Sequence, residues 1–161
     1  MRTLHPDTII RALVEADHSE IIEIVAGLPD WFDETARTIS IPIDIRHQRG
    51  FVAERHGEVV GFISLYVAEG KLNISWLGVR YDLHRHGIGR LLVEKAEDVA
   101  RQLGVKAVAL YTLGEGVAYE PYERTRQFYL AIGFRVYQRS QTDNPGCPEE
   151  IKMSKVVSEA A

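Results

Sequence analysis

Hydrophobic runs and alternations separated by short polar turns predict the strands of this chain. Two of the turns, residues 56–58 and 69–70, are so short that the strands on either side are expected to be antiparallel neighbours. A mostly apolar run after Gly104 is typical of a strand buried on both faces. The expected strands cover residues 8–13, 51–55, 59–68, 72–79, 105–112 and 151–156, with one more that begins at Phe134.

Apolar residues at helical spacing predict a long helix, and a proline predicts another, in the second half of the chain. Gly104 stands where a C-terminal glycine cap would end the first helix. Pro121 suits the first turn of the second helix, which is expected to end near Ile132. The apolar face of the first helix comprises Ile88, Leu91, Leu92, Ala96, Val99, Ala100 and Leu103.

The N-terminal third carries weaker signals. Asp17, with Glu20 three residues later, matches a capping box and predicts a helix. Trp31 and Phe32 are expected to open a second short helix. Residues 40–48 are ambiguous, because isoleucines alternate there as in a strand although a proline stands among them.

This order of elements predicts an α/β fold, with a mixed, mostly antiparallel central sheet flanked by about four helices. At 161 residues the chain fits a single domain, expected to span residues 1–161, that can bury a core without disulfides. No apolar run is long enough to cross a bilayer, and the first residues lack the apolar stretch of a secretory leader. A cytoplasmic protein without membrane contact is therefore expected.

Charge, cysteine and histidine usage narrow the class of function. The formal net charge of -4 argues against binding nucleic acid through bulk charge, since such domains are usually basic. The single cysteine, Cys147, excludes an intrachain disulfide and belongs to no paired motif, so no cysteine nucleophile is expected. No metal site is expected, because metal-ligand spacing is absent from His5, His18, His47 and His56.

A glycine-containing turn stands between a predicted strand and the long helix that begins near Ile88. Gly87 and Gly89 lack a Cβ atom, so the backbone can bend tightly there and a ligand can approach it closely. Free amides at a helix start, together with the positive end of the helix dipole, bind phosphate. Four basic side chains add donors around the turn, namely His84, Arg85, His86 and Arg90.

Two common phosphate-binding motifs do not match this turn. A dinucleotide-binding fingerprint needs a third glycine where Leu92 stands. A Walker A loop needs a lysine followed by serine or threonine where Arg90 and Leu91 stand. A purely structural role, in which the two glycines relieve a crowded turn, is the alternative.

The strand Trp76-Leu77-Gly78-Val79 and the turn that follows it resemble the core motif Gln/Arg-x-x-Gly-x-Gly/Ala of the GNAT superfamily of N-acetyltransferases. The resemblance extends over most of the chain and implies the GNAT fold, with acetyl-CoA as co-substrate. It implies that the turn amides hold the coenzyme A pyrophosphate, and that the strand backbone contacts the pantetheine arm like an added strand. The residues implied in these contacts are Leu77, Val79, His84, Arg85, His86, Gly87, Ile88, Gly89 and Arg90.

The sequence departs from the family motif at three positions of this turn. His84 replaces the usual glutamine or arginine, while Arg85 and Tyr81 stand where glycine and proline are frequent. Amide contacts do not depend on side chains, so the departures leave open only which side chains touch phosphate. Residues 27–32 and 122–129 together resemble a bacterial branch of the superfamily.

The segment from Phe128 to Phe134 resembles a second family signature, Phe-Tyr-x-x-x-Gly-Phe. The resemblance implies that Tyr129 protonates the leaving coenzyme A thiolate, a role that suits a phenol beside a thioester. Packing of this ring against the sheet is the alternative. Tyr122 stands where many family members carry an asparagine that contacts the pantetheine arm, and its role stays open.

The general base is not identified by the sequence. An amine nucleophile must lose a proton, because lysine-like amines have a pKa of about 10.4. Asn73 or Ile74 falls where many relatives carry a glutamate, and neither is a base, although Ser75 could orient a water. Acidic residues near the expected site are weak candidates for the base, namely Glu23, Asp33, Glu115 and Glu120.

These observations predict an N-acetyltransferase that moves an acetyl group from acetyl-CoA to a primary amine by direct attack in a ternary complex. The acceptor is a small-molecule or peptide amine. A non-catalytic coenzyme A-binding sensor or partner-binding module is one alternative, and a nucleotide-binding protein is another. Homodimers are common in the family, but nothing in the sequence shows one.

Details of the acceptor site stay open at this point. Trp31 and Phe32 either form one wall of that site or anchor the N-terminal helices to the core. Contacts of Tyr122 and of residues 115–120 with a ligand are equally open. A cationic acceptor, such as a polyamine, an amino sugar or a lysine amine, is favoured by Asp30, Asp33, Glu34, Glu115 and Glu120.

Overall fold

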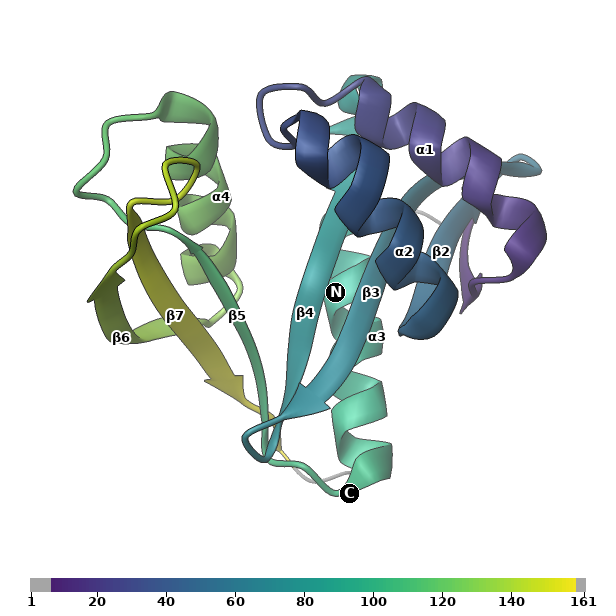
Figure 1. The fold of residues 1–161 in the computed structure, drawn as a ribbon. Coiled ribbons are helices and arrows are strands. Elements are labelled where there is room, and N and C mark those ends of the chain that lie inside the picture. Colours follow the sequence, from purple (N-terminus) through teal and green to yellow (C-terminus); the bar gives the residue numbers. More distant parts are fainter. Residues whose placement is uncertain (1–6, 159–161) are drawn as a thin grey trace.

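A computed structural model describes residues 7–158 of the chain. One seven-stranded sheet forms its centre, with the strand order β1-β2-β3-β4-β5-β7-β6 (Figure 1). The strands are β1 (Thr8–Ala12), β2 (Arg49–Arg55), β3 (Glu58–Ala68), β4 (Lys71–Val79), β5 (Ala107–Leu113), β6 (Arg135–Gln141) and β7 (Glu149–Val156). The β4–β5 pair is parallel and the other pairs are antiparallel, which confirms the predicted mixed, mostly antiparallel α/β fold.

Helices cover both faces of this sheet. They are α1 (His18–Ala26), α2 (Ile41–His47), α3 (Ile88–Leu103) and α4 (Glu120–Ala131), with short helical turns η1 (Glu15–Asp17), η2 (Ala36–Ser40) and η3 (Tyr81–Leu83). The buried faces of α1 and α2 pack with Phe62 and Val59 on one side of the sheet. The apolar face of α3 packs on the other side, in a core that also holds Tyr129 and Phe134. No helix in residues 7–158 is long and apolar enough to cross a membrane.

The sheet opens between β4 and β5. Within the described residues these strands pair at Leu72 with Val108 and at Asn73 with Ala109, and beyond that point they diverge (Figure 1). A register shift against β3 makes Ser75 an extra residue in β4, and such a bulge bends a strand and increases its twist. The divergence leaves the second half of β4 without a partner on the β5 side.

The long helix α3 ends as the sequence predicts. Gly104 follows Leu103 with a φ of 75°, a left-handed conformation that costs a glycine little. Helix α4 begins one residue before Pro121, and its last residue is Ala131. Both predicted helices of the second half are therefore confirmed to within one residue at each end.

The predicted capping box at Asp17 and Glu20 is wrong. The Asp17 carboxylate accepts hydrogen bonds from the Arg11 guanidinium at 2.8 and 2.9 Å and from the Val14 N–H at 2.9 Å. The Glu20 carboxylate accepts the Val59 N–H of β3 at 3.1 Å. Both acidic side chains therefore bind strand or loop groups rather than the amides of α1.

The second short helix does not begin at Trp31 and Phe32, which lie in a turn after α1. The Asp33 carboxylate accepts the Ala36 N–H at 2.8 Å, so helical structure starts after this capping residue and continues into α2. Ile41 and Ile45 are buried on one face of α2, and Ile43 is half exposed. The isoleucines of residues 40–48 therefore follow the i, i+4 spacing of a helix face rather than the alternation of a strand.

Candidate active site

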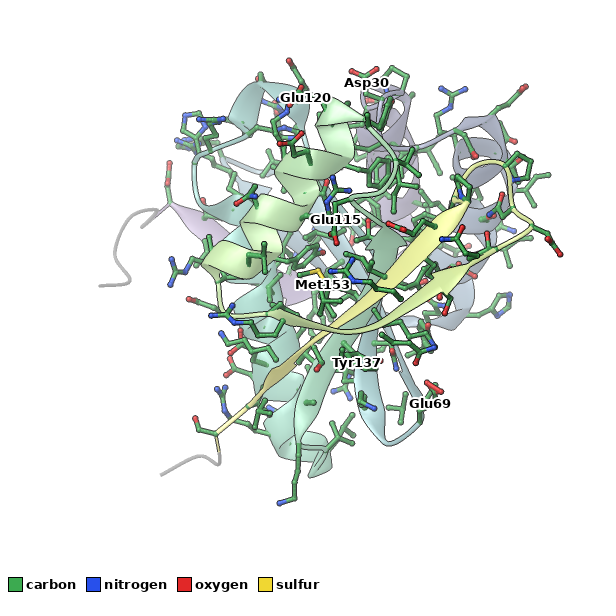
Figure 2. The ribbon with its side chains drawn as sticks, turned by 90° about the vertical axis from the view of Figure 1, so that its left-hand side faces the viewer. Asp30, Glu69, Glu115, Glu120, Tyr137 and Met153 are labelled. Atoms are coloured by element: carbon green, nitrogen blue, oxygen red, sulfur yellow. The ribbon has the colours of Figure 1, made fainter. Side chains whose placement is uncertain are left out.

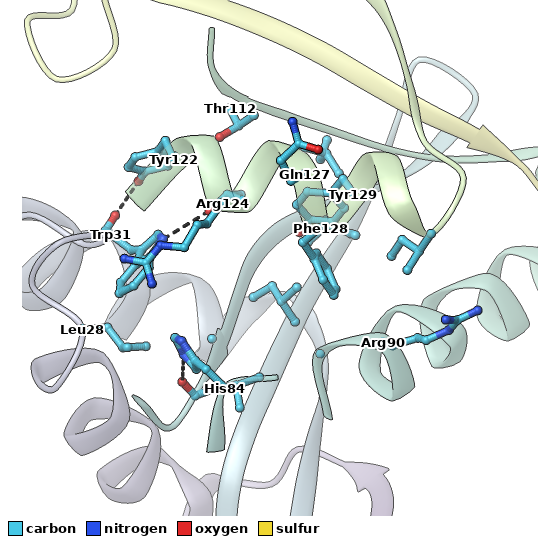
Figure 3. A pocket seen from close by; sticks show the side chains of 18 of the residues that line it. Leu28, Trp31, His84, Arg90, Thr112, Tyr122, Arg124, Gln127, Phe128 and Tyr129 are labelled. Atoms are coloured by element: carbon cyan, nitrogen blue, oxygen red, sulfur yellow. Dashed lines mark hydrogen bonds between the residues drawn. The ribbon is translucent and has the colours of Figure 1, made fainter. Parts of the chain in front are cut away.

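A cavity of about 840 Å³ lies where β4 and β5 diverge, with α3 and α4 as its further walls (Figure 3). It brings together nearly all the site residues predicted from the sequence. His86 is the one that is not among its lining residues. The predicted residues that line it are Leu77, Val79, His84, Arg85, Gly87, Ile88, Gly89, Arg90 and Tyr129.

The unpaired edge of β4 presents backbone groups to this cavity. Val79 lies opposite Gly61 of β3, and the Arg80 N–H bonds the Val60 carbonyl at 2.8 Å. This pattern makes Val79 a non-hydrogen-bonded position of the antiparallel ladder, so its own amide and carbonyl point away from β3. Leu77, two residues earlier and opposite Ile63, has the same orientation. An extended ligand can therefore bind this edge as an added strand would.

His84 takes up one of these backbone groups. Its Nε2 lies 2.8 Å from the Val79 carbonyl oxygen, and because a carbonyl only accepts, Nε2 carries the proton. The ring is also held between Trp31, at 5.4 Å between ring centroids, and Tyr81, at 5.3 Å. Val79 thus offers its N–H to a ligand, while its carbonyl fixes the start of the glycine turn.

The N-terminus of α3 faces the cavity with uncapped amides. Gly87 precedes the helix with a φ of 82°, and the Leu91 N–H makes the first helical bond to the Gly87 carbonyl at 3.1 Å. No side chain of residues 7–158 caps this end, and the first turn holds no acidic residue. The amides of Ile88, Gly89 and Arg90 are therefore available to an anion, and helix starts of this kind bind phosphate in other proteins.

Gly89 also lets α3 and α4 approach each other. A Cβ atom at this position would meet the Phe128 ring at 3.3 Å, a tight contact. The glycine turn and the helix that carries Tyr129 can be adjacent because position 89 has no side chain. This packing reason adds to the access that the glycine gives to a ligand.

Arg85 adopts a left-handed backbone conformation, with a φ of 66°. For a residue with a Cβ atom this conformation costs about 1–2 kcal/mol. We expect Arg85→Gly to raise the unfolding free energy by up to about 1 kcal/mol, measured by urea denaturation without ligand. Arg90→Gly is the matched control, because Arg90 lies in the helix and glycine there destabilises by about 1 kcal/mol. A loss of stability in both variants would contradict the assigned strain.

Tyr129, on α4, lines the cavity, and only 5% of the residue is exposed. Its ring lies 5.0 Å from the Phe128 ring and 5.2 Å from the Phe134 ring, centroid to centroid, both in edge-on packing. Burial raises the pKa of the phenol well above its ordinary value, so the hydroxyl keeps its proton. No group in the described residues forms a hydrogen bond with this hydroxyl, which leaves it available to a ligand.

Trp31 and Tyr122 join the α1–η2 turn to α4 across the mouth of the cavity, as Figure 3 shows. The Tyr122 hydroxyl donates to the Trp31 carbonyl, and the Trp31 indole N–H donates to the Pro121 carbonyl at 3.0 Å. The Arg124 guanidinium lies 5.3 Å from the centre of the indole ring. The sequence left the roles of Trp31 and Tyr122 open, and both line the cavity. Arg124, which no motif singles out, lines it as well.

The acidic residues considered as bases are mostly engaged elsewhere. Glu115 forms an ion pair with Arg139, and Glu120 pairs with Arg124 at 2.6 Å. The Asp33 carboxylate accepts the Ala36 N–H, as described above. Of these acidic residues, Glu120 lines the cavity. No group of three metal-ligating side chains occurs within residues 7–158.

Comparison with known proteins gives the same family as the motifs. The acetyltransferase (GNAT) family model matches residues 12–134. An uncharacterized N-acetyltransferase of Chlorobaculum tepidum is 38% identical over 158 residues, which cover 93% of this chain and 94% of that protein. Two solved structures share the fold at 18–19% identity.

The first of these structures is the ribosomal-protein-S18-alanine N-acetyltransferase from Escherichia coli, with a TM-score of 0.73 over 96% of each chain. The second is a paiA N-acetyltransferase from Thermoplasma acidophilum in complex with coenzyme A, with a TM-score of 0.70 over 92% of this chain and 98% of that chain. This chain therefore belongs to the acetyltransferase (GNAT) family, whose members are acyltransferases that use acetyl-CoA as co-substrate.

Proposed function

We propose that this protein transfers the acetyl group of acetyl-CoA directly to a primary amine, with both substrates bound together. The observation that carries the proposal is one cavity in which the open backbone edge of β4, the uncapped start of α3 and the Tyr129 phenol meet. A long substrate with an amide-containing arm, a phosphate end and a thioester matches these three features in that order.

The β4 edge and the α3 amides hold the donor. The Leu77 and Val79 amides bind the arm by strand addition, and the amides of residues 88–90 bind the pyrophosphate. Arg85 and Arg90 add positive charge at the same end. These contacts direct the thioester toward Tyr129.

The reaction needs one bond to form and one to break. The neutral amine nitrogen attacks the thioester carbonyl carbon, a C–N bond forms, and the C–S bond breaks as the sulfur leaves. Tyr129 donates its proton to the departing thiolate, and the attacking nitrogen loses a proton to water or a base. A buried phenol suits this step, since burial keeps it protonated at neutral pH.

Amine-dependent release of coenzyme A tests the proposal. We expect free thiol and N-acetylated product to appear in a 1:1 ratio when acetyl-CoA is supplied with a panel of cationic, neutral and anionic amines. Thermal shift with acetyl-CoA, ATP and NAD should show stabilisation by acetyl-CoA alone. Binding of acetyl-CoA without turnover of any amine would identify a coenzyme A-binding module instead.

A further inference from the structure

A second cavity, of about 320 Å³, lies on the sheet face away from α3. The strand register places Lys152 opposite Tyr111, and the alternate residues Ile151 and Met153 are buried in the core with α3. Figure 2 shows Tyr137 and Glu69, two of its lining residues, near the tip of the β3–β4 hairpin. The full lining is Tyr66, Ala68, Glu69, Asn73, Leu110, Tyr111, Tyr137, Glu150 and Lys152.

The second cavity adjoins the candidate active site. Leu110 and Tyr111 of β5 line both cavities, at the place where β5 leaves β4. On the other side of this gap, Trp76 lines the first cavity and donates its indole N–H to the Asp44 carboxylate at 2.7 Å. A molecule that extends from the thioester through the gap would therefore enter the second cavity.

Three tyrosine rings give the second cavity an aromatic lining. Tyr66 comes from β3, Tyr111 from β5 and Tyr137 from β6. A register shift between β6 and β7 makes Tyr137 an extra residue in its strand, and such bulges redirect side chains. The Lys71 ammonium lies 5.3 Å from the centre of the Tyr137 ring, so one of these rings already binds a cation.

Carboxylates outnumber cations among the residues that line this cavity. Glu69 and Glu150 line the cavity with Lys152, and none of the three forms an ion pair within residues 7–158. Burial raises the pKa of the Tyr111 phenol, and Glu150, Cys147 and Asp44 raise it further. Burial also raises the pKa of Tyr66, so the phenols of Tyr66 and Tyr111 stay neutral. Neutral aromatic rings beside unpaired carboxylates bind an organic cation.

We propose that the acceptor carries two amino groups, with one at the thioester and the other, as an ammonium ion, among Tyr66, Tyr111 and Glu150. This rests on the acetyl transfer proposed above and specifies its substrate as a diamine-like cation. The reacting amine must be neutral, whereas the remote one stays charged because its pKa is about 10.4. The second cavity thereby selects among amines without contacting the reacting atoms.

A matched series of amines tests this selection. Straight-chain α,ω-diamines of increasing length are compared with n-alkyl monoamines of the same length, using thiol release to measure kcat/KM. We expect the diamine to exceed its monoamine by roughly tenfold or more at one optimal length, as for a partly buried ion pair with cation–π contact. Equal kcat/KM for both amines at every length would overturn the inference and leave the proposed acetyl transfer intact.

Two substitutions in the second cavity are expected to shift the diamine-to-monoamine ratio of kcat/KM in opposite directions. Glu150→Gln removes an attracting charge and should lower the diamine-to-monoamine ratio by roughly tenfold. Lys152→Met removes a like charge and should raise it. Asp98→Asn, on the exposed side of α3, changes the net charge by the same amount as Glu150→Gln and should leave the ratio as it is.

Binding without chemistry provides the second readout. The diamine of optimal length should perturb the NMR signals of the tyrosine rings in the second cavity. The spectra are recorded on the unmodified protein without acetyl-CoA. Two results together would overturn the diamine assignment. They are a preference of the parent protein for carboxylate-bearing acceptors and the loss of all selectivity among amines in Lys152→Met. Failure of every amine in the presence of acetyl-CoA would instead contradict the proposed function itself.

Discussion

Replacing Tyr129 by phenylalanine is expected to lower kcat by about 10²–10⁴-fold, the range typical of a lost general acid. The ring contacts with Phe128 and Phe134 do not need the hydroxyl, so the core should stay packed. The thiolate would then leave without a proton donor in a site where burial disfavours charge. Steady-state thiol release with a saturating amine measures the change.

The control for this substitution is Tyr81→Phe, because Tyr81 is 59% exposed and does not line the cavity. It should alter kcat by less than about twofold, and both variants should keep the wild-type affinity for acetyl-CoA. Because burial raises the pKa of Tyr129 above the ordinary value of about 10, the protonated form persists and wild-type kcat should not fall up to pH 10. Wild-type turnover in Tyr129→Phe would remove the acid role from this residue.

Replacing Gly87 by alanine is expected to weaken acetyl-CoA binding by about 5- to 30-fold. Gly87 holds a φ of 82° at the start of α3, and a side chain there adds about 1–2 kcal/mol of strain. The mutant turn relaxes away from this conformation and must return to it to present the three amides, so the strain is subtracted from the binding free energy. Isothermal titration with acetyl-CoA measures the loss.

Gly104→Ala is a matched control at the other end of the same helix. Gly104 has a φ of 75°, and a Cβ atom there would contact nothing within 4 Å. Gly104→Ala should therefore lose about 1–2 kcal/mol of unfolding free energy and keep its acetyl-CoA affinity, whereas Gly87→Ala relaxes its turn in the free protein and loses affinity instead. If the two variants bind acetyl-CoA equally well, the start of α3 is not the phosphate site.

The parts of the fold that the sequence predicts well are those with local causes. The strands around the 56–58 and 69–70 turns and the helix from Ile88 to Gly104 follow from periodicity and glycine alone. In the N-terminal third the prediction failed where distant groups compete for the same side chain. Asp17 meets Arg11 of the neighbouring strand, and the isoleucines of α2 have a spacing compatible with either periodicity.

The candidate site shows the same division. Its glycines, its basic turn and Tyr129 are visible as motifs, and the structure places all but His86 of the predicted residues around one cavity. The hydrogen bond from His84 to the Val79 carbonyl and the contact of Trp31 with Tyr122 follow from no motif. The partners in the second contact are 91 residues apart, so only the folded chain brings them together.

The amino-acid sequence by itself determined the family, the donor and the order of most elements, because these depend on local pattern and on contiguous motifs. The tertiary structure alone decided which backbone groups of β4 are open, since that depends on where β5 stops pairing with it. It also decided that residues from β3, β4, β5, β6 and β7 enclose a second cavity beside the first. Side chains from five strands share a surface only after the sheet has formed, and no spacing along the chain records that arrangement.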